Sequence, residues 1–415
     1  MNTEVPPGWE EKTLGSCALY INGYAFKPED WHEFGTPIIR IKQLHDANAH
    51  YDSCPRDLPE KFVINNGDLI FSWSATLSLK IWDRGKAFLN QHLYKVIARS
   101  GVDKIFLKYL IEFNLDSLAG ETHGSTMKHI TRPHLLEYCV ALPKSISEQK
   151  KIASILQSVD NAIYMTMELI EKYEKMKQRL IQDLFTRGID ENYKPHTELK
   201  DSALGEIPRN WKVYELGSMG SFKNGINKDK DAFGHGVKFV NIIDAYADEL
   251  DLASLGRLDA NHNEVREYKL EEGDIIFVRS SVKPEGVGYN TLFSGYKEEV
   301  LFCGFMIRFR LFNKHDNTPL FFNYYFRSEE FRRRLLSRSS VSANTNINQV
   351  SLRKLLCVVP LPDEQKRMCG RLISIDNSIH SQEALVNKLT KIKNGLMQDL
   401  LTGKVRVAAY YECRI

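Results

Sequence analysis

The chain has 415 residues, which is more than one hydrophobic core usually supports, so two or more domains are expected. Hydrophobic residues make up 43% of the chain and charged residues 26%, a balance that is typical of a folded globular protein and excludes a disordered one. The 56 basic and 53 acidic residues leave a net charge of +3, which excludes a uniformly basic protein. Any nucleic-acid-binding face must therefore arise from basic residues sorted onto one side.

The sequence has no signal of a membrane or secreted protein. No apolar run approaches the about 20 residues that a bilayer span needs. The first eleven residues lack the basic and apolar regions of a secretory signal. The seven cysteines are scattered without a Cys-x-x-Cys pair, which is typical of cytosolic proteins and predicts neither a disulfide framework nor a zinc knuckle. We therefore expect a cytoplasmic protein.

In chain order, the predicted elements describe two similar halves of mixed α/β structure. The first half has expected strands at 36–41, 68–71 and 93–98, a helix at 104–114 and a closing strand at 138–142. The second has expected strands at 237–242, 274–278 and 301–311, a helix at 320–336 that opens with Pro319, and a closing strand at 356–361. The predicted boundaries are 1–146 and 207–361 for two globular domains, 147–187 and 362–403 for two long helices, 188–206 for a linker and 404–415 for a tail.

The two halves form an internal repeat. Trp9 is followed by a Leu-Gly pair and an Asn-Gly pair, and the same order follows Trp211, at an offset of 211 − 9 = 202. A Gly-Asp-aliphatic-aliphatic-Phe segment at 67–71 returns at 273–277, and Glu-Gln-Lys at 148–150 returns at 364–366. Aligning 147–187 with 363–403 gives 17 identities in 41 positions. The offset between matching segments grows from 202 to 273 − 67 = 206 and then to 364 − 148 = 216, so the segments recur while the loops between them differ in length. This pattern predicts a duplicated scaffold with different loops, and hence two related but non-identical binding surfaces.

The repeated block reads as a long amphipathic helix with a seven-residue period over five heptads. Both copies interrupt the apolar a and d positions at the same two places, Thr166/Gln382 and Lys177/Lys393. Because neither helix can bury its stripe alone, we expect an intramolecular antiparallel coiled coil; the alternative is two ordinary helices that each lie on a core. The predicted seam consists of Ile152, Leu156, Val159, Ile163, Ile170, Tyr173, Leu180 and Leu184, with Met368, Leu372, Ile375, Ile379, Val386, Leu389, Leu396 and Leu400.

Residues at the ends of the two blocks predict where the helices begin and end. Ser147 and Asp363 are predicted N-caps, each followed by Glu and Gln in the first turn. Gly188 and Gly403 stand where a glycine follows a helix C-terminus. At 1.5 Å per residue, a helix of some 40 residues is a rod of roughly 60 Å.

Each half also has loops suited to binding a polyanion, because small hydroxyl residues beside Lys or Arg can contact phosphates and base edges. The alternative is that these are solvated turns and a solvated helix face. The first half offers Ser72, Trp73, Ser74, Thr76, Lys80, Lys128 and His129 as base contacts. The second offers Arg279, Ser280, Ser281, Lys283, Asn344 and Asn346 as base contacts, and Arg332, Arg333, Arg334 and Arg338 as phosphate contacts.

No catalytic constellation is found in the sequence. It contains no Gly-x-Gly-x-x-Gly after a strand, no phosphate-binding Gly-x4-Gly-Lys-[Ser/Thr] loop and no Gly-x-Ser-x-Gly elbow. Its twelve histidines show no His-Glu-x-x-His and no metal-ligand spacing with cysteine. We therefore predict neither a catalytic centre nor a metal site in this chain.

The order of these motifs closely resembles the specificity (S) subunit of type I restriction–modification systems, over about residues 6–407. The resemblance depends on Gly-Trp, Leu-Gly, Gly-Asp-Leu-Ile-Phe and the duplicated Glu-Gln-Lys helix that ends in Gln-Asp-Leu. It implies two target-recognition domains that each read one half of a bipartite, asymmetric site in double-stranded DNA. The long helices would set the gap between the half-sites and dock the partner subunits.

The resemblance also implies which partners supply the chemistry. Two modification (M) subunits would bind S-adenosylmethionine and methylate adenine, and two restriction (R) subunits would use ATP and magnesium to translocate and cleave DNA. This chain would hold no cofactor. Three alternatives remain: a non-catalytic coiled-coil scaffold for proteins, an enzyme with an unrecognised site, and the specificity partner of a fused restriction–methyltransferase enzyme.

Overall fold

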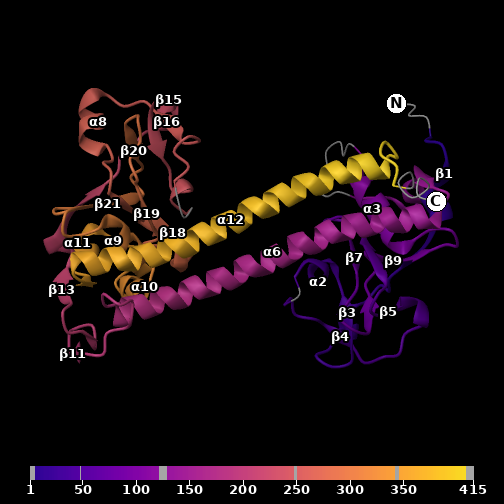
Figure 1. The fold of residues 1–415 in the computed structure, drawn as a ribbon, viewed down its shortest axis with the longest axis horizontal. Coiled ribbons are helices and arrows are strands. Elements are labelled where there is room, and N and C mark those ends of the chain that lie inside the picture. Colours follow the sequence, from indigo (N-terminus) through magenta and orange to yellow (C-terminus); the bar gives the residue numbers. More distant parts are fainter. Residues whose placement is uncertain (1–4, 47, 121–128, 247–249, 342–344, 408–415) are drawn as a thin grey trace. The chain divides into compact units, whose positions relative to one another are not determined.

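The computed structural model of the protein describes residues 5–46, 48–120, 129–246, 250–341 and 345–407. The chain folds as two compact units. Unit 1 consists of residues 1–168 and 383–415, and unit 2 consists of residues 169–382. Each unit therefore contains one globular domain and a part of each long helix (Figure 1).

The domain of unit 1 contains two four-stranded sheets. The first has the order β2-β9-β6-β7 and is antiparallel: β2 is Ala18–Asn22, β9 is Leu93–Ala98, β6 is Leu69–Ser72 and β7 is Ser78–Ile81. The second has the order β4-β3-β8-β5, with β3 parallel to β8: β4 is Ser53–Cys54, β3 is Thr36–Ile39, β8 is Ala87–Leu89 and β5 is Val63–Ile64. A further pair, β1 (Trp9–Thr13) and β10 (Cys139–Pro143), brings the start of the domain beside its end. The helices are α1 (Leu14–Cys17), α2 (Ile41–His45), α3 (Lys104–Phe113), α4 (Leu115–Ala119) and α5 (Arg132–Glu137).

The domain of unit 2 repeats this plan. Its main sheet has the order β14-β21-β17-β19: β14 is Gly220–Asn224, β21 is Met306–Leu311, β17 is Ile275–Val278 and β19 is Asn290–Leu292. The second sheet has the order β16-β15-β20, with β15 parallel to β20: β16 is Gly256–Leu258, β15 is Phe233–Val240 and β20 is Val300–Phe302. The closing pair is β13 (Lys212–Glu215) and β24 (Leu356–Val359). The helices include α7 (Leu216–Met219), α8 (His262–Tyr268), α9 (Pro319–Phe326), α10 (Glu329–Ser337) and α11 (Gln349–Arg353). The predicted duplication of a mixed α/β scaffold is thus confirmed.

Two predicted elements of unit 2 are each broken in the structure. The expected strand 301–311 is two strands, because the chain turns at Gly304, where an added Cβ would lie only 1.9 Å from the Asn227 side chain. The expected helix 320–336 is two helices, α9 and α10. The break falls at Ser328, whose hydroxyl accepts a hydrogen bond from the Phe331 amide at 3.4 Å and so caps α10.

The long helices α6 (Ile146–Arg187) and α12 (Pro362–Leu401) run antiparallel within each unit (Figure 1). In unit 1, Ile152 and Leu156 of α6 share a core with Leu400 of α12. In unit 2, Leu184 of α6 shares a core with Leu372 of α12. Every residue of the predicted seam is buried or half-buried.

The predicted N-caps Ser147 and Asp363 are wrong, because both lie inside the first turn. The hydroxyl of Ser145 accepts from the Glu148 amide at 3.4 Å, and α12 begins at Pro362, a residue that suits the first turn of a helix. The C-terminal glycines are confirmed. Gly188 and Gly403 have φ angles of 60° and 71°, the left-handed conformation of a glycine that follows a helix.

A buried glutamine joins each long helix to its domain. The side-chain oxygen of Gln149 accepts from the amide of Asp103, the N-cap of α3, at 2.7 Å, and its amide group donates to the carbonyls of Gly101 and Pro143. Gln365 repeats this contact: its oxygen accepts from the amide of Thr318, the N-cap of α9, at 2.8 Å. Both glutamines are fully buried.

We expect Gln365→Leu to lower the stability of unit 2. The change leaves the Thr318 amide and two carbonyls without a partner inside the protein, at a cost of about 1–3 kcal/mol for each group that stays buried. Thermal and urea unfolding of the whole chain measure this loss. Gln157→Leu, at an exposed position of α6, is the control. An unchanged unfolding transition for Gln365→Leu would contradict the assigned role.

Candidate nucleic-acid interface

In unit 1, the end of strand β6 forms the centre of the candidate site. The backbone carbonyl of Trp73 accepts from the amide of Ile130 at 3.0 Å, and Ser74 forms an antiparallel bridge with His129. These contacts bring together predicted site residues that are more than fifty positions apart in the sequence. Ser72 is fully buried and supports the turn, because its hydroxyl donates to the Ser74 carbonyl at 3.3 Å.

An aromatic group forms around Trp73. Its ring lies 4.9 Å from the His129 ring and 5.8 Å from the His92 ring, and the Ser74 hydroxyl is 3.4 Å from Nδ1 of His92. Both histidines are exposed. We call Trp73, Ser74, His92 and His129 the unit 1 patch. His92 was not predicted, because only the sheet register shows that the residue before β9 lies beside the end of β6.

The other predicted residues of unit 1 lie elsewhere. Lys80 pairs with Ile70 across β6 and β7, on the opposite sheet face from Phe71 and the Trp73 ring that packs with Tyr94. Burial lowers the pKa of Lys80, and the nearby Arg84 charge adds to this effect. Thr76 is exposed in the turn. Lys128 lies outside the described residues.

Unit 2 builds an equivalent site with different residues. The amide of Ile347 donates to the Arg279 carbonyl at 3.0 Å, and Ser280 pairs with Asn346 between β18 (Ser280–Ser281) and β23 (Thr345–Asn346). The Arg279 amide also donates to the Phe305 carbonyl at 2.8 Å. The register of the two main sheets makes Trp73 equivalent to Arg279, His92 to Phe305 and His129 to Asn346.

The unit 2 site contains a cavity. Ser280, Ser281 and Lys283 line a cavity of about 590 Å³ together with Tyr246 and Phe305. Phe305 is 59% exposed and the neighbouring Val282 is 82% exposed. Hydroxyl, ammonium, arginine and exposed apolar side chains therefore lie within one surface region, which we call the unit 2 patch and define as Arg279–Lys283, Phe305 and Asn346. Asn344 lies outside the described residues.

The four predicted phosphate contacts divide into two kinds. Arg334 is half-buried and donates to the Tyr325 hydroxyl at 2.8 Å and to the Leu356 carbonyl at 3.1 Å, so its guanidinium holds β24 against α9. Arg332 is also half-buried and donates to the Glu285 carbonyl at 2.6 Å, and burial lowers its pKa. Arg333 and Arg338 are exposed.

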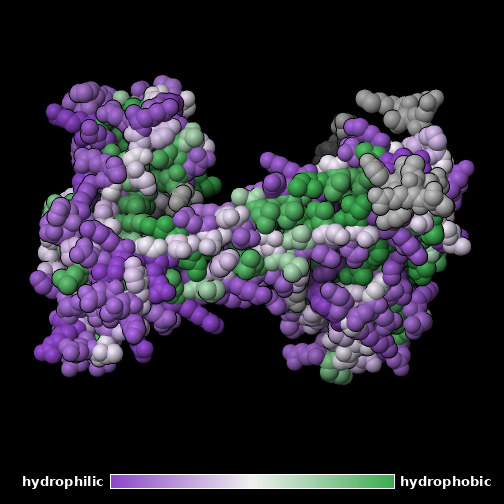
Figure 2. Space-filling model, in the orientation of Figure 1, coloured by the Kyte–Doolittle hydropathy of each residue, from purple (hydrophilic) through white to green (hydrophobic). Residues whose placement is uncertain are grey.

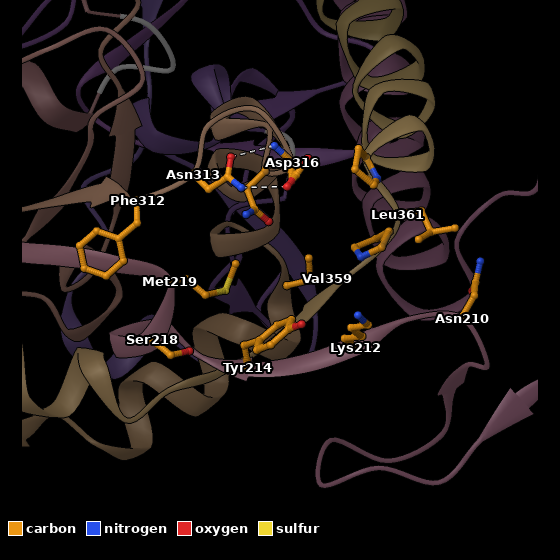
Figure 3. Close-up of a pocket in the computed structure, with 13 residues that line it drawn as sticks. Asn210, Lys212, Tyr214, Ser218, Met219, Phe312, Asn313, Asp316, Val359 and Leu361 are labelled. Atoms are coloured by element: carbon orange, nitrogen blue, oxygen red, sulfur yellow. Dashed lines mark hydrogen bonds between the residues drawn. The ribbon is translucent and has the colours of Figure 1, made fainter.

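A second hollow of unit 2, of about 510 Å³, lies between the β13–β24 pair and the loop after β21 (Figure 3). Figure 3 shows Asn313 and Asp316 bonded to each other at its edge, where the Asn313 amide donates to the Asp316 carboxylate at 2.8 Å. Among the described residues that line it, Lys212 is the only cation. The cavity of the unit 2 patch likewise has one lysine and one carboxylate in its lining, Lys283 and Glu285, so charge alone does not distinguish the two hollows.

The described residues contain neither a candidate metal site nor a candidate membrane-spanning helix. No group of three or more His, Cys, Asp or Glu side chains among them could hold a metal ion. In the same part of the chain, no helix is both long and apolar enough to span a bilayer.

Comparison with known proteins identifies the scaffold. The family described as the type I restriction modification DNA specificity domain matches residues 6–175 and again residues 208–391. The chain belongs to this family. The two matched ranges coincide with the two halves of the repeat. The globular domain of each unit therefore lies within one matched range.

Known relatives agree over almost the full chain. The MjaVIII specificity subunit of Methanocaldococcus jannaschii is 27% identical, with 97% of this chain and 94% of that protein covered. The EcoKI specificity subunit of Escherichia coli K12 is 21% identical, with coverage of 97% and 89%. The crystal structure of the Mycoplasma genitalium S subunit matches with a TM-score of 0.55 and 16% identity, covering 97% of both chains, which shows a shared fold. A structure described as showing complex assembly of the type I restriction–modification system has a TM-score of 0.59 at 15% identity, covering 97% of this chain and all of that one.

The different environments of two adjacent arginines lead to a prediction about stability. Arg334→Met should lower the thermal midpoint of unit 2. The Leu356 carbonyl loses its Arg334 donor, at a cost of about 1–3 kcal/mol if it stays buried, and the Tyr325 hydroxyl keeps only the long bond from the Val358 amide at 3.4 Å. Arg333→Met, one position away on the exposed face of α10, should leave that midpoint unchanged. Differential scanning calorimetry of both variants makes the comparison, and equal midpoints would refute the structural role of Arg334.

Proposed function

We propose that this chain is the sequence-specific DNA-binding subunit of a type I restriction–modification complex, in which each unit reads one half of a bipartite, asymmetric site. The observation that carries the proposal is the pair of equivalent patches. One scaffold position holds Trp73 in unit 1 and Arg279 in unit 2, and a second holds His129 and Asn346. A duplicated scaffold with different side chains at equivalent positions is what two unlike half-sites require.

The chemistry of the patches suits DNA. Arginine can form two hydrogen bonds to guanine, asparagine can form two to adenine, and apolar side chains can contact the thymine methyl group. Arg279, Asn346 and the exposed Val282 supply these three groups in unit 2. Lys283 and the exposed Arg338 are suited to phosphates, which position a protein on the duplex without reading its sequence.

The long helices supply the other half of the proposed role, as a spacer and a dock. Each is continuous through both units. Large apolar side chains are exposed on them: Tyr164, Met165 and Met167 on α6, and Leu385 and Ile392 on α12. Figure 2 shows hydrophobic side chains gathered on α12 toward its C-terminal end. Exposed apolar surface of this kind marks protein interfaces, and methionine adapts well to them.

In this proposal the partners on the helices are two modification subunits, and restriction subunits join them. S-adenosylmethionine, ATP and magnesium act on those partners, and this chain is non-catalytic. The complex works on DNA in the cytoplasm.

Single-molecule methylation mapping tests the proposal directly. A host that expresses this chain with its neighbouring methyltransferase should carry methyladenine at one gapped two-part motif, and omission of this chain should abolish it. Replacing residues 1–146 with the matching domain of a relative should change one half of the motif and leave the other half intact. Methylation that persists without this chain would refute the proposal and favour a protein scaffold.

Single substitutions in the patches should separate the two half-sites. Arg279→Ala should relax the motif at one position of one half, with a loss of about 1–3 kcal/mol of discrimination there. Trp73→Ala, at the equivalent position of unit 1, should act on the other half. Arg338→Ala should weaken binding to all sequences uniformly and reduce its salt dependence. Binding titrations with single-base variants at two salt concentrations measure all three, and an unchanged motif for Arg279→Ala would contradict its assignment.

A further inference from the structure

A hydrogen-bonded junction in unit 1 connects the recognition domain to both long helices. The hydroxyl of Tyr109, on α3, donates to Oδ2 of Asp160, on α6, at 2.7 Å. The other carboxylate oxygen, Oδ1, lies 2.7 Å from Nζ of Lys393, on α12. The Lys393 ammonium also lies over the Tyr109 ring, 5.6 Å from its centre.

Unit 2 contains the same junction with the roles of the helices exchanged. The hydroxyl of Tyr324, on α9, donates to Oδ2 of Asp376, on α12, at 2.5 Å. Oδ1 of Asp376 lies 2.7 Å from Nζ of Lys177, on α6. In both units, therefore, the aspartate comes from the helix that follows the domain, and the lysine comes from the other helix.

The junctions contain the polar interruptions that the sequence shows in the helix seam, Lys177 and Lys393. The four charged side chains are only 13–29% exposed. Burial raises the pKa of Tyr109 and Tyr324, and the hydrogen bonds to Asp160 and Asp376 raise it further, so both hydroxyls remain donors at neutral pH. Apolar residues of similar size would avoid the desolvation of these charges, and polar residues at such positions are known to fix helix register.

Each junction is the second of two attachments between the same pair of helices. Gln149 holds the N-cap of α3, and Asp160, 160 − 149 = 11 residues further along α6, holds Tyr109. Gln365 and Asp376 have the same spacing on α12, 376 − 365 = 11, and hold the N-cap and Tyr324 of α9. One attachment would allow the domain helix to pivot, whereas two attachments about three turns apart set its direction along the long helix.

We propose that the two Tyr–Asp–Lys junctions are positioning devices that set the orientation of each recognition domain on the helix pair, and so determine which gap between half-sites is accepted. The inference rests on the proposed function. The hydrophobic effect is non-directional, whereas the hydrogen bonds and ion pairs of the junctions have a defined geometry and add to the orientation that packing permits. The lysine adds register, because sliding one helix along the other separates it from its aspartate.

The test uses the whole methyltransferase complex and a library of DNA sites in which the gap varies by one or two base pairs around the natural length. The variants are Tyr324→Phe and Lys177→Met, which remove one arm of the unit 2 junction each. Lys177→Arg keeps the charge, and Lys175→Met is the matched control, because Lys175 is exposed on the same helix. Thermal unfolding verifies that each variant is folded.

We expect the wild type, Lys177→Arg and Lys175→Met to prefer one gap. Tyr324→Phe and Lys177→Met should raise methylation at neighbouring gaps, relative to the natural gap, by about tenfold, with the bases of both half-sites unchanged. A sharp, unaltered gap preference in these two folded variants would overturn the inference, and so would a uniform loss of methylation at every gap. If the wild type itself methylates no gapped motif, the proposed function fails instead.

Discussion

The rest of the structure depends on the hydrogen bonds by which one buried glutamine in each unit joins a long helix to its domain. Gln149 and Gln365 each satisfy a helix N-cap amide and two carbonyls where water is excluded. Because a buried polar group without a partner is costly, the domain and its long helix are held together as one body. The orientation of each domain, with its patch, is therefore tied to the helix that follows it in the chain.

The glutamate that precedes each glutamine in the Glu-Gln-Lys motif binds a segment that follows the other long helix. In unit 1, both carboxylate oxygens of Glu148 accept from the guanidinium of Arg406, which follows α12 and has its pKa raised by this contact. In unit 2, Glu364 accepts from the Trp211 indole at 3.1 Å and lies 3.0 Å from Nε2 of His196, in the linker that follows α6. The same Glu-Gln-Lys motif therefore binds different residues in the two units: Arg406 in unit 1, and Trp211 and His196 in unit 2.

The sequence predicts the parts of this fold that depend on local periodicity, and it fails where distant contacts decide. The repeat and the seven-residue period were enough to predict the duplicated domains and two long helices. The sequence places Gln149 in the first turn of α6 but does not predict its contact, because its partner Asp103 lies 46 residues away. Lys80 was assigned to the site from its position after β6, yet strand alternation places it on the other face. His92 and Phe305 were missed because only strand pairing brings them beside the patches.

The placement of the patches shows how one scaffold can carry two different sets of surface side chains. Phe71 and Phe277 are fully buried in the cores of their units, and each is followed within two residues by a patch residue, Trp73 or Arg279. The Trp73 and Arg279 carbonyls accept backbone hydrogen bonds that fix the main chain at these positions. Such main-chain bonds do not depend on which side chain the residue carries. The side chain at this position can therefore differ between the units, although in unit 1 the Trp73 ring also packs against Tyr94 of the core. Main-chain hydrogen bonds fix the strand ends, so the patch side chains differ between the units while the glutamine attachments and the Tyr–Asp–Lys junctions are the same in both.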